Sequence, residues 1–135
     1  PLVSIDLIVQ NSEGHILLGE RKNRPAQGYW FVPGGRILKN ESLADAFKRL
    51  SLKELGVQLD NTEANIQGPY ENFNNDSVFG DGPSTHYVAI AYRLALTTLS
   101  ALPKEQHSSY RWFSVSELLA HPDVHSHTKL YFSED

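Results

Sequence analysis

The chain has 135 residues, 40% of them hydrophobic, and a formal net charge of −4. We take residues 1–135 as a single domain, because this length and composition are typical of one globular unit. Because there is no Cys, the composition excludes disulfides and thiolate metal sites. The sequence also argues against nucleic acid or a membrane as a partner, because it has neither a basic run nor an apolar run of about 20 residues.

The N-terminal third predicts a hairpin and then a long loop. Residues 3–9 alternate between apolar and polar side chains, as in a strand buried on one face, with Asp6 on the polar face. The polar residues 11–14 predict a turn, and residues 15–19 the returning strand. Residues 23–35 are rich in Pro and Gly and predict a structured loop.

Residues 42–55 predict the clearest helix of the chain. Ser42 has an acidic residue three positions later and suits the N-cap, and Gly56 suits the left-handed position after the last turn. The apolar stripe expected to face the core is formed by Leu43, Phe47 and Leu50.

The C-terminal half predicts two more strands and a short helix. The polar stretches 72–84 and 99–109 are predicted loops, residues 86–96 a long strand and 110–113 a short one. Ser114 opens a second helix. This order of strands and helices predicts an α/β sandwich around a mixed β-sheet.

The stretch from Gly34 to Glu54 carries the residues most relevant to chemistry. Gly34 and Gly35 allow the backbone to approach a ligand closely and leave their carbonyl groups open to a cation. A carboxylate on the following helix, Glu54, could hold a hard cation such as Mg²⁺, which binds a few protein oxygens together with substrate phosphates. The same residues could also be an ordinary glycine turn followed by a helix with a solvated Glu. The spacing of the residues has to distinguish a metal site from this simpler interpretation.

That spacing resembles the Nudix box. Gly35 is followed after five residues by Glu41, after seven more by Arg49, and then by Glu54-Leu-Gly-Val57, with Pro33-Gly34 directly before it. The resemblance implies the Nudix-type α/β/α sandwich around a mixed β-sheet. It also implies a substrate in which a nucleoside diphosphate is linked to another moiety.

The box departs from the family pattern at its carboxylates. Where the family has Arg-Glu, an apolar residue, any residue and Glu-Glu, this chain has Leu50, Ser51, Leu52, Lys53 and Glu54 after the Arg. Two of three carboxylates are replaced, one of them by a cation. Several divalent ions would therefore lack ligands, which argues against the usual attack of water on phosphorus.

The GDP-mannose mannosyl hydrolases are the branch of the family that shows the same replacements. The chain is similar to them in the runs 23–36, Thr85-His-Tyr87, Glu105-Gln-His107 and Tyr110-Arg-Trp112. The resemblance implies hydrolysis of GDP-mannose, with GDP-glucose as an alternative, to GDP and the free sugar, and it implies a homodimer.

The resemblance also implies roles for individual residues. The metal, Mg²⁺ with Mn²⁺ as a substitute, would be held by the Gly34 carbonyl, the Glu54 carboxylate and the Gln106 side-chain oxygen. His107 is the candidate general base, because imidazole titrates near neutral pH. The other catalytic and substrate-binding candidates are Arg21 and Arg36 at the diphosphate, Tyr87 as a hydrogen-bond donor and Asp6 as a carboxylate that stabilises a cationic sugar.

Three further features of the sequence bear on the site. Glu41 and Arg49 resemble a structural ion pair that ties the metal loop to the helix. His121 and His125 would suit a zinc ion if residues 121–125 were helical, but Pro122 indicates a helix start there. Asn72 stands where the similar enzymes often have His, and residues 77–82 also look divergent, which leaves sugar preference open.

Three functions stay open on the sequence alone: a glycosyl hydrolase acting at carbon, a conventional Nudix pyrophosphatase that gives GMP and sugar phosphate, and a Nudix-fold binding module. The lost carboxylates favour the first and third, and the combination of Glu54, Gln106 and His107 favours the first. The chain begins at Pro1 and has no Met, so we expect natural N-terminal residues to be missing from it. A cytoplasmic location is the default expectation.

Overall fold

The computed structural model describes residues 1–22, 27–74, 85–96 and 107–133. Its strands are β1 (Leu2–Gln10), β2 (Ile16–Arg21), β3 (Trp30–Phe31), β4 (Gly34–Arg36), β5 (Asn65–Asn74), β6 (Thr85–Ala95) and β7 (His107–Phe113). Its helices are α1 (Leu43–Leu55), the short 3₁₀ helix η1 (Asn61–Glu63), α2 (Val115–Ala120) and α3 (Ser126–Lys129).

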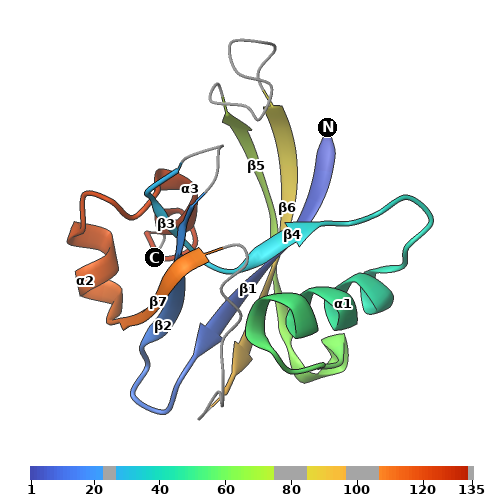
Figure 1. The fold of residues 1–135 in the computed structure, drawn as a ribbon, viewed down its shortest axis with the longest axis horizontal. Helices are drawn as coiled ribbons and strands as arrows, with labels where there is room; N and C mark the ends of the chain where they lie inside the picture. Colours follow the sequence, from blue (N-terminus) through green and yellow to red (C-terminus); the bar gives the residue numbers. More distant parts are fainter. Residues whose placement is uncertain (23–26, 75–84, 97–106, 134–135) are drawn as a thin grey trace.

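The strands form one mixed sheet with β1 at its centre (Figure 1). The order along the sheet is β3-β2-β1-β6-β5, with β4 paired to β1 and β7 paired to β2. The pairing of β1 with β6 is parallel and the other pairings of described strands are antiparallel. Together with the flanking helices, this arrangement confirms the predicted α/β fold around a mixed β-sheet.

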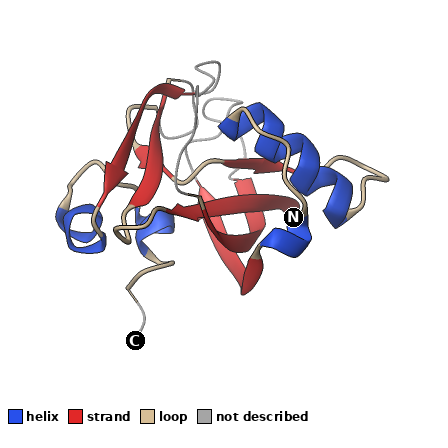
Figure 2. Cartoon of the chain, turned by 90° about the horizontal axis from the view of Figure 1, so that it is seen from below, coloured by secondary structure: helices blue, strands red, loops and turns tan. Residues whose placement is uncertain are grey.

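The helices cover the sheet from two sides (Figure 2). Ile5, Leu7 and Val9 of β1 pack with Phe47 and Leu50 of α1 on one side. On the other side, Ile8 of β1 belongs to a second cluster, which also contains residues of other strands and of the C-terminal segment, among them Ile16, Ala91, Phe113, Leu118, Val124 and Tyr131.

This second cluster corrects the expectation for Asp6. The alternation in β1 puts Asp6 on the same face as Ile8, and the C-terminal segment covers that face. The predicted solvent-facing side of β1 is therefore partly a second core. A period-2 pattern identifies two faces but cannot say what packs on the more polar one.

The boundaries of α1 agree with the prediction. Ser42 Oγ accepts a hydrogen bond of 3.1 Å from the Asp45 amide, and Gly56 has a left-handed φ of 79°. The predicted position of Leu43 in the core is wrong, because the first turn of α1 lies away from the sheet and leaves this side chain 39% exposed (Figure 1).

Several segments predicted as loops contain strands. β3 and β4 lie within residues 23–35 or directly after them, residues 72–74 end β5, and β7 begins at His107. Pro, Gly and polar residues make these stretches resemble loops, but their backbone groups pair with other strands of the sheet. The predicted strand at 110–113 is confirmed as part of β7, and Ser114 is confirmed as an N-cap, since its Oγ accepts from the Glu117 amide at 3.1 Å.

The C-terminal segment docks against the strand that precedes the glycines. The Trp30 amide donates to the Asp123 carbonyl at 2.8 Å, and the His125 amide donates to the Trp30 carbonyl at 3.1 Å. Two residues further on, the Val32 amide donates to Thr128 Oγ1 at 3.3 Å. Residues 123–128 therefore support the entry to Gly34. Within the described ranges, no helix has the length and apolar character needed to cross a membrane.

Candidate active site

Gly34 lies against Asp6 at the centre of the sheet. The two residues are direct partners in the antiparallel pairing of β4 with β1, next to the pair formed by Ile5 and Gly35. A Cβ atom at Gly34 would overlap the Ile5 carbonyl oxygen and Asp6 Oδ1. Glycine is therefore needed here for close approach, as the sequence suggested, and the nearest side-chain atom is the carboxylate of a predicted site residue.

Glu54 faces the interior at the last turn of α1. Only 2% of the residue is exposed, and its backbone carbonyl accepts a hydrogen bond of 3.3 Å from the Tyr110 hydroxyl of β7. Its charge acts on two other predicted site residues: it raises the pKa of Asp6 by repulsion and supports the charged form of Arg21 by attraction. Glu54, Asp6 and Arg21 therefore lie within electrostatic range of one another.

Asp6 has an environment that the sequence did not indicate. Burial raises the pKa of its carboxyl group to about 6, a hydrogen bond from Tyr131 works against this shift, and the negative charge of Glu54 adds to it. The Tyr131 hydroxyl donates to Asp6 Oδ2. Sequence reasoning missed Tyr131, and no local signal could have found it, because 125 positions separate the two residues.

Arg21 and His107 are neighbours on adjacent strands. They are register partners at the end of the β2–β7 pairing. The register shifts just before them, because Glu20 pairs with Ser109 and Arg21 pairs with His107, so that the pairing skips Ser108. Such irregularities redirect side chains and are frequent next to active sites. Burial lowers the pKa of Arg21, while Glu54 and Tyr87 favour its charged form. Gln106, the third predicted metal ligand, lies outside the described residues.

Tyr87 and Arg36 lie on the strands beside Asp6. Tyr87 of β6 pairs with Leu2 of β1 on one side and with Asn72 of β5 on the other. Its electrostatic effect on Arg21 places it with the same group. Arg36 is exposed at the end of β4, two residues beyond Gly34. Of the predicted site residues, the structure therefore gathers Asp6, Arg21, Gly34, Glu54 and Tyr87, with His107 next to Arg21 along the backbone.

A family model described as a NUDIX domain matches residues 1–133. The chain belongs to the Nudix family. It is 41% identical over 124 residues to the low-salt glycan biosynthesis protein Agl8 of Haloferax volcanii, an alignment that covers 92% of this chain and 78% of Agl8. The residues described above are therefore the candidate site of a Nudix hydrolase.

Solved structures agree on the Nudix fold. The MutT protein of Methanosarcina mazei Go1 has a TM-score of 0.79 at 21% identity, covering 97% of this chain and 89% of that one. The MutT NUDIX hydrolase of Burkholderia pseudomallei has a TM-score of 0.75 at 26% identity, covering 97% and 95%. The NUDIX domain of Shewanella oneidensis NrtR, solved in complex with ADP ribose, has a TM-score of 0.72 at 21% identity, covering 96% and 83%.

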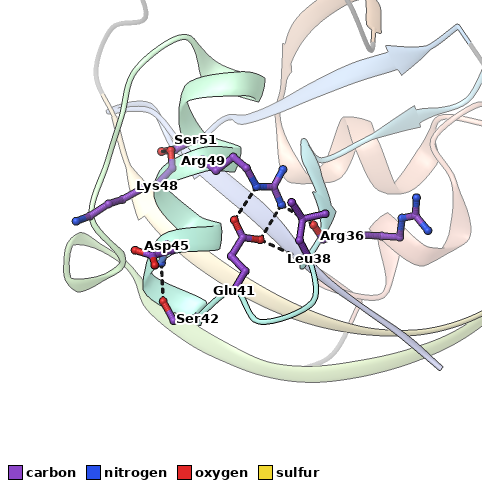
Figure 3. A network of polar contacts seen from close by, with 8 residues as sticks. All are labelled: Arg36, Leu38, Glu41, Ser42, Asp45, Lys48, Arg49 and Ser51. Atoms are coloured by element: carbon purple, nitrogen blue, oxygen red, sulfur yellow. Dashed lines mark hydrogen bonds and ion pairs between the residues drawn. The ribbon is translucent and has the colours of Figure 1, made fainter.

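The Nudix box is held together by the expected ion pair (Figure 3). Arg49 Nε donates to Glu41 Oε2 at 2.8 Å, and one terminal nitrogen of Arg49 reaches Glu41 Oε1 at 3.0 Å and the Arg36 carbonyl at 2.8 Å. Glu41 Oε1 also accepts from the Leu38 amide at 3.0 Å. These bonds raise the pKa of Arg49 and lower that of Glu41. The pair thus fixes the loop between β4 and α1.

The replaced box positions have become structural. Leu50 is buried in the core, and its Cδ2 atom lies 2.7 Å from the place a Cβ would take on Gly35. Ser51 is also buried; its hydroxyl donates to the Lys48 carbonyl at 3.1 Å and accepts from the Leu59 amide at 2.9 Å. Lys53 is exposed. Of the box positions that carry metal-binding carboxylates in the family, only Glu54 is both acidic and buried.

The described residues fit a divalent cation, which Nudix hydrolases generally use. The negative charge of Glu54 acts on the Asp6 carboxylate by repulsion, and a cation held by Glu54 would relieve that repulsion. Within the described ranges no group of three or more His, Cys, Asp or Glu residues could hold a metal. The fit therefore depends on the backbone at Gly34 and on substrate oxygens as well as on Glu54.

The C-terminal histidines are arranged differently from a zinc pair on one helix. His121 ends α2, and His125 is the N-cap of α3, so residues 121–125 are not helical and the predicted helix start at Pro122 is wrong. The His125 ring stacks on Phe31 with 4.6 Å between centroids, and burial lowers its pKa to about 4. His125 thus serves as a cap and a packing residue of the C-terminal segment.

Proposed function

We propose that this Nudix hydrolase converts GDP-mannose, and as an alternative GDP-glucose, to GDP and the free sugar, with water attacking the anomeric carbon. One observation carries the proposal: of the three box positions that carry metal-binding carboxylates in the family, only Glu54 is still acidic, and Leu50 packs into the core at another. Conventional attack on phosphorus depends on several metal ions, for which these residues offer too few ligands. The glycan-biosynthesis name of the 41% identical relative agrees with a sugar nucleotide as substrate.

In this proposal the Gly34 carbonyl, the Glu54 carboxylate and the Gln106 side chain hold Mg²⁺ or, in its place, Mn²⁺. When bound, the metal supplies positive charge to the diphosphate. Arg21 and Arg36 add guanidinium groups that suit phosphate oxygens, and Tyr87 adds a phenolic donor. The partial burial of Arg21 strengthens its attraction for a developing negative charge.

Asp6 and His107 act at the sugar. The Asp6 carboxylate stabilises positive charge at the anomeric carbon as the bond to the diphosphate oxygen lengthens. His107 takes a proton from water, the water oxygen bonds to that carbon, and the electron pair of the broken C–O bond leaves with GDP. A base that acts from the face opposite the leaving group inverts the configuration, so α-linked GDP-mannose gives β-mannose.

Hydrolysis in ¹⁸O-labelled water tests where the bond breaks. We expect the label in mannose and none in GDP, with both products identified by anion-exchange chromatography and mass spectrometry. Label in a phosphate, with release of GMP and mannose phosphate, would show conventional pyrophosphatase chemistry instead. If the protein hydrolysed no sugar nucleotide, the result would favour the third function, a Nudix-fold binding module.

Two further expectations belong to this proposal. We take the protein to act in the cytoplasm, which is the default expectation, and to form a homodimer, as its similarity to the mannosyl hydrolases implies. Light scattering coupled to size-exclusion chromatography measures the mass of the assembly, and a monomeric mass would contradict the dimer.

A further inference from the structure

The hydroxyl of Tyr131 donates a hydrogen bond to the carboxylate of Asp6. Tyr131 follows α3 and is only 5% exposed, and its hydroxyl donates to Asp6 Oδ2. The other carboxylate oxygen, Oδ1, lies against Gly34, at the place where a Cβ of that residue would be. The phenol therefore occupies one oxygen of the carboxylate and directs the second toward the glycine turn.

Tyr131 is itself held from several directions. Its backbone carbonyl accepts a hydrogen bond of 2.9 Å from Gln67 Nε2, and its ring meets the Tyr70 ring edge-on with 4.7 Å between centroids. The Gln67 side chain also bonds Arg93 at 3.1 Å, and the Arg93 guanidinium lies 5.4 Å above the Phe132 ring. The phenol thus comes from a rigid support built by β5, β6 and the C-terminal segment.

The same segment also supports the glycine turn. Thr128 Oγ1 accepts from the Val32 amide at 3.3 Å, and the Pro33 carbonyl then accepts from the Leu7 amide at 2.8 Å. One short stretch of chain, Thr128 to Tyr131, therefore sets both the carboxylate of Asp6 and the approach to Gly34. A stretch that only packed against its neighbours would not need a buried hydroxyl that donates to a carboxylate.

We propose that Tyr131 is a positioning residue of the reaction centre, which holds the Asp6 carboxylate in the orientation that the chemistry at the sugar requires. The inference rests on the proposed function, because it assigns Asp6 to the reacting carbon. Tyr131 touches Asp6 and acts through it.

The experiment is a double-mutant cycle on kcat with Tyr131→Phe, Asp6→Asn and the combined variant. Tyr131→Phe keeps the ring against Tyr70 and removes only the hydroxyl. We expect kcat to fall about 10- to 100-fold, the range for one hydrogen bond to a charged group, with KM little changed. In the Asp6→Asn background, the same substitution should cause no further loss. Independent, multiplying losses would overturn the proposal.

Tyr70→Phe is the matched control. It removes a hydroxyl from the same support, where Tyr70 accepts a 3.0 Å bond from Gln67, without touching Asp6. We expect this variant to keep the wild-type kcat. Calorimetry of GDP with Mn²⁺ gives a second readout, in which Tyr131→Phe should bind as the wild type does. A Tyr131→Phe protein that loses kcat and GDP binding together would show general damage and overturn the positioning role.

The wild-type protein, assayed on a panel of nucleoside diphosphate derivatives, separates this inference from the proposed function. Release of GMP would overturn the proposed function, and the cycle would then be run on that reaction, where coupling between Asp6 and Tyr131 still supports the positioning role. Absence of turnover on the whole panel would overturn both.

Discussion

Gly34 and Asp6 lie opposite each other in neighbouring strands, so close that any side chain on the glycine would meet the carboxylate. This contact joins the predicted metal loop to the carboxylate assigned to the sugar. The site therefore depends on a backbone approach as much as on its charged groups.

The two glycines of the turn should respond differently to alanine. At Gly34 the new Cβ would overlap the Ile5 backbone carbonyl and Asp6 Oδ1, neither of which can yield easily, so Gly34→Ala should cost about 1–3 kcal/mol of stability and abolish activity. At Gly35 the nearest atom is a terminal methyl of Leu50, 2.7 Å away, which can turn aside. Gly35→Ala, the matched control, should lose less stability in urea denaturation. Equal losses would contradict the assigned contacts.

Because Glu54 is the one metal-binding carboxylate of the box that remains, we predict one essential divalent ion per subunit in the substrate complex. Glu54→Gln removes the charge and keeps the volume, so activity should fall about 100-fold or more while the fold is retained. Glu13→Gln removes the same charge from the exposed turn after β1 and should leave activity unchanged. Manganese titration followed by EPR measures the stoichiometry. Three ions per site would contradict the single-metal interpretation.

Asp6 should make the protein less stable as pH rises through the mildly acidic range. Its pKa is 3.8 in a free chain and about 6 in the folded protein, so between these values the unfolded chain has already lost the proton that the folded protein keeps. The contribution of Asp6 to the free energy of unfolding is therefore complete below pH 3.8. It decreases as the pH rises from 3.8 to about 6, by about 3 kcal/mol at most.

Asp6→Asn does not titrate and isolates this effect. Its unfolding free energy, measured in urea with EDTA, should match that of the wild type near pH 4 and exceed it above pH 6. His125, whose lowered pKa has the opposite effect as pH falls, is common to both proteins and cancels in the difference. A stability difference that does not change with pH would show that Asp6 is not buried as its neighbours indicate.

His107 is predicted to be the general base, and such help is worth about 10²–10⁴-fold. His107→Gln should lower kcat by that order with little change in KM, and should remove the acidic limb of the pH profile. His15→Gln, at the start of β2 and away from the gathered site residues, serves as the control. An acidic limb that persists in the His107 variant would assign the base to another group.

The Arg49–Glu41 pair should act on the metal loop rather than on the chemistry. Lysine keeps the charge but cannot bond both Glu41 oxygens and the Arg36 carbonyl together. Arg49→Lys should weaken Mn²⁺ binding about 10- to 100-fold, as expected for a residue that orients a ligand loop. Lys48→Gln, which removes the neighbouring exposed pair with Asp60, should leave binding unchanged. Unaltered Mn²⁺ affinity in Arg49→Lys would contradict this role.

The sequence by itself determined the features that depend on near neighbours. The ends of α1 follow from Ser42 and Gly56, because a cap bonds to backbone groups within one turn. The Nudix family follows from the spacing of Gly35, Glu41, Arg49 and Glu54, because the loop and helix between them fix how far apart those groups lie. The same spacing exposed the replaced carboxylates.

The tertiary structure decided what lies against those features. The sequence pattern marked Asp6 as polar-facing, whereas docking of the C-terminal segment buries that face and raises the pKa of the carboxyl group. β3 and β4 looked like loop because their backbone partners lie in other strands. Tyr131 carried no signal, since its contact with Asp6 spans almost the whole chain and forms only when the sheet and the C-terminal turn have packed together.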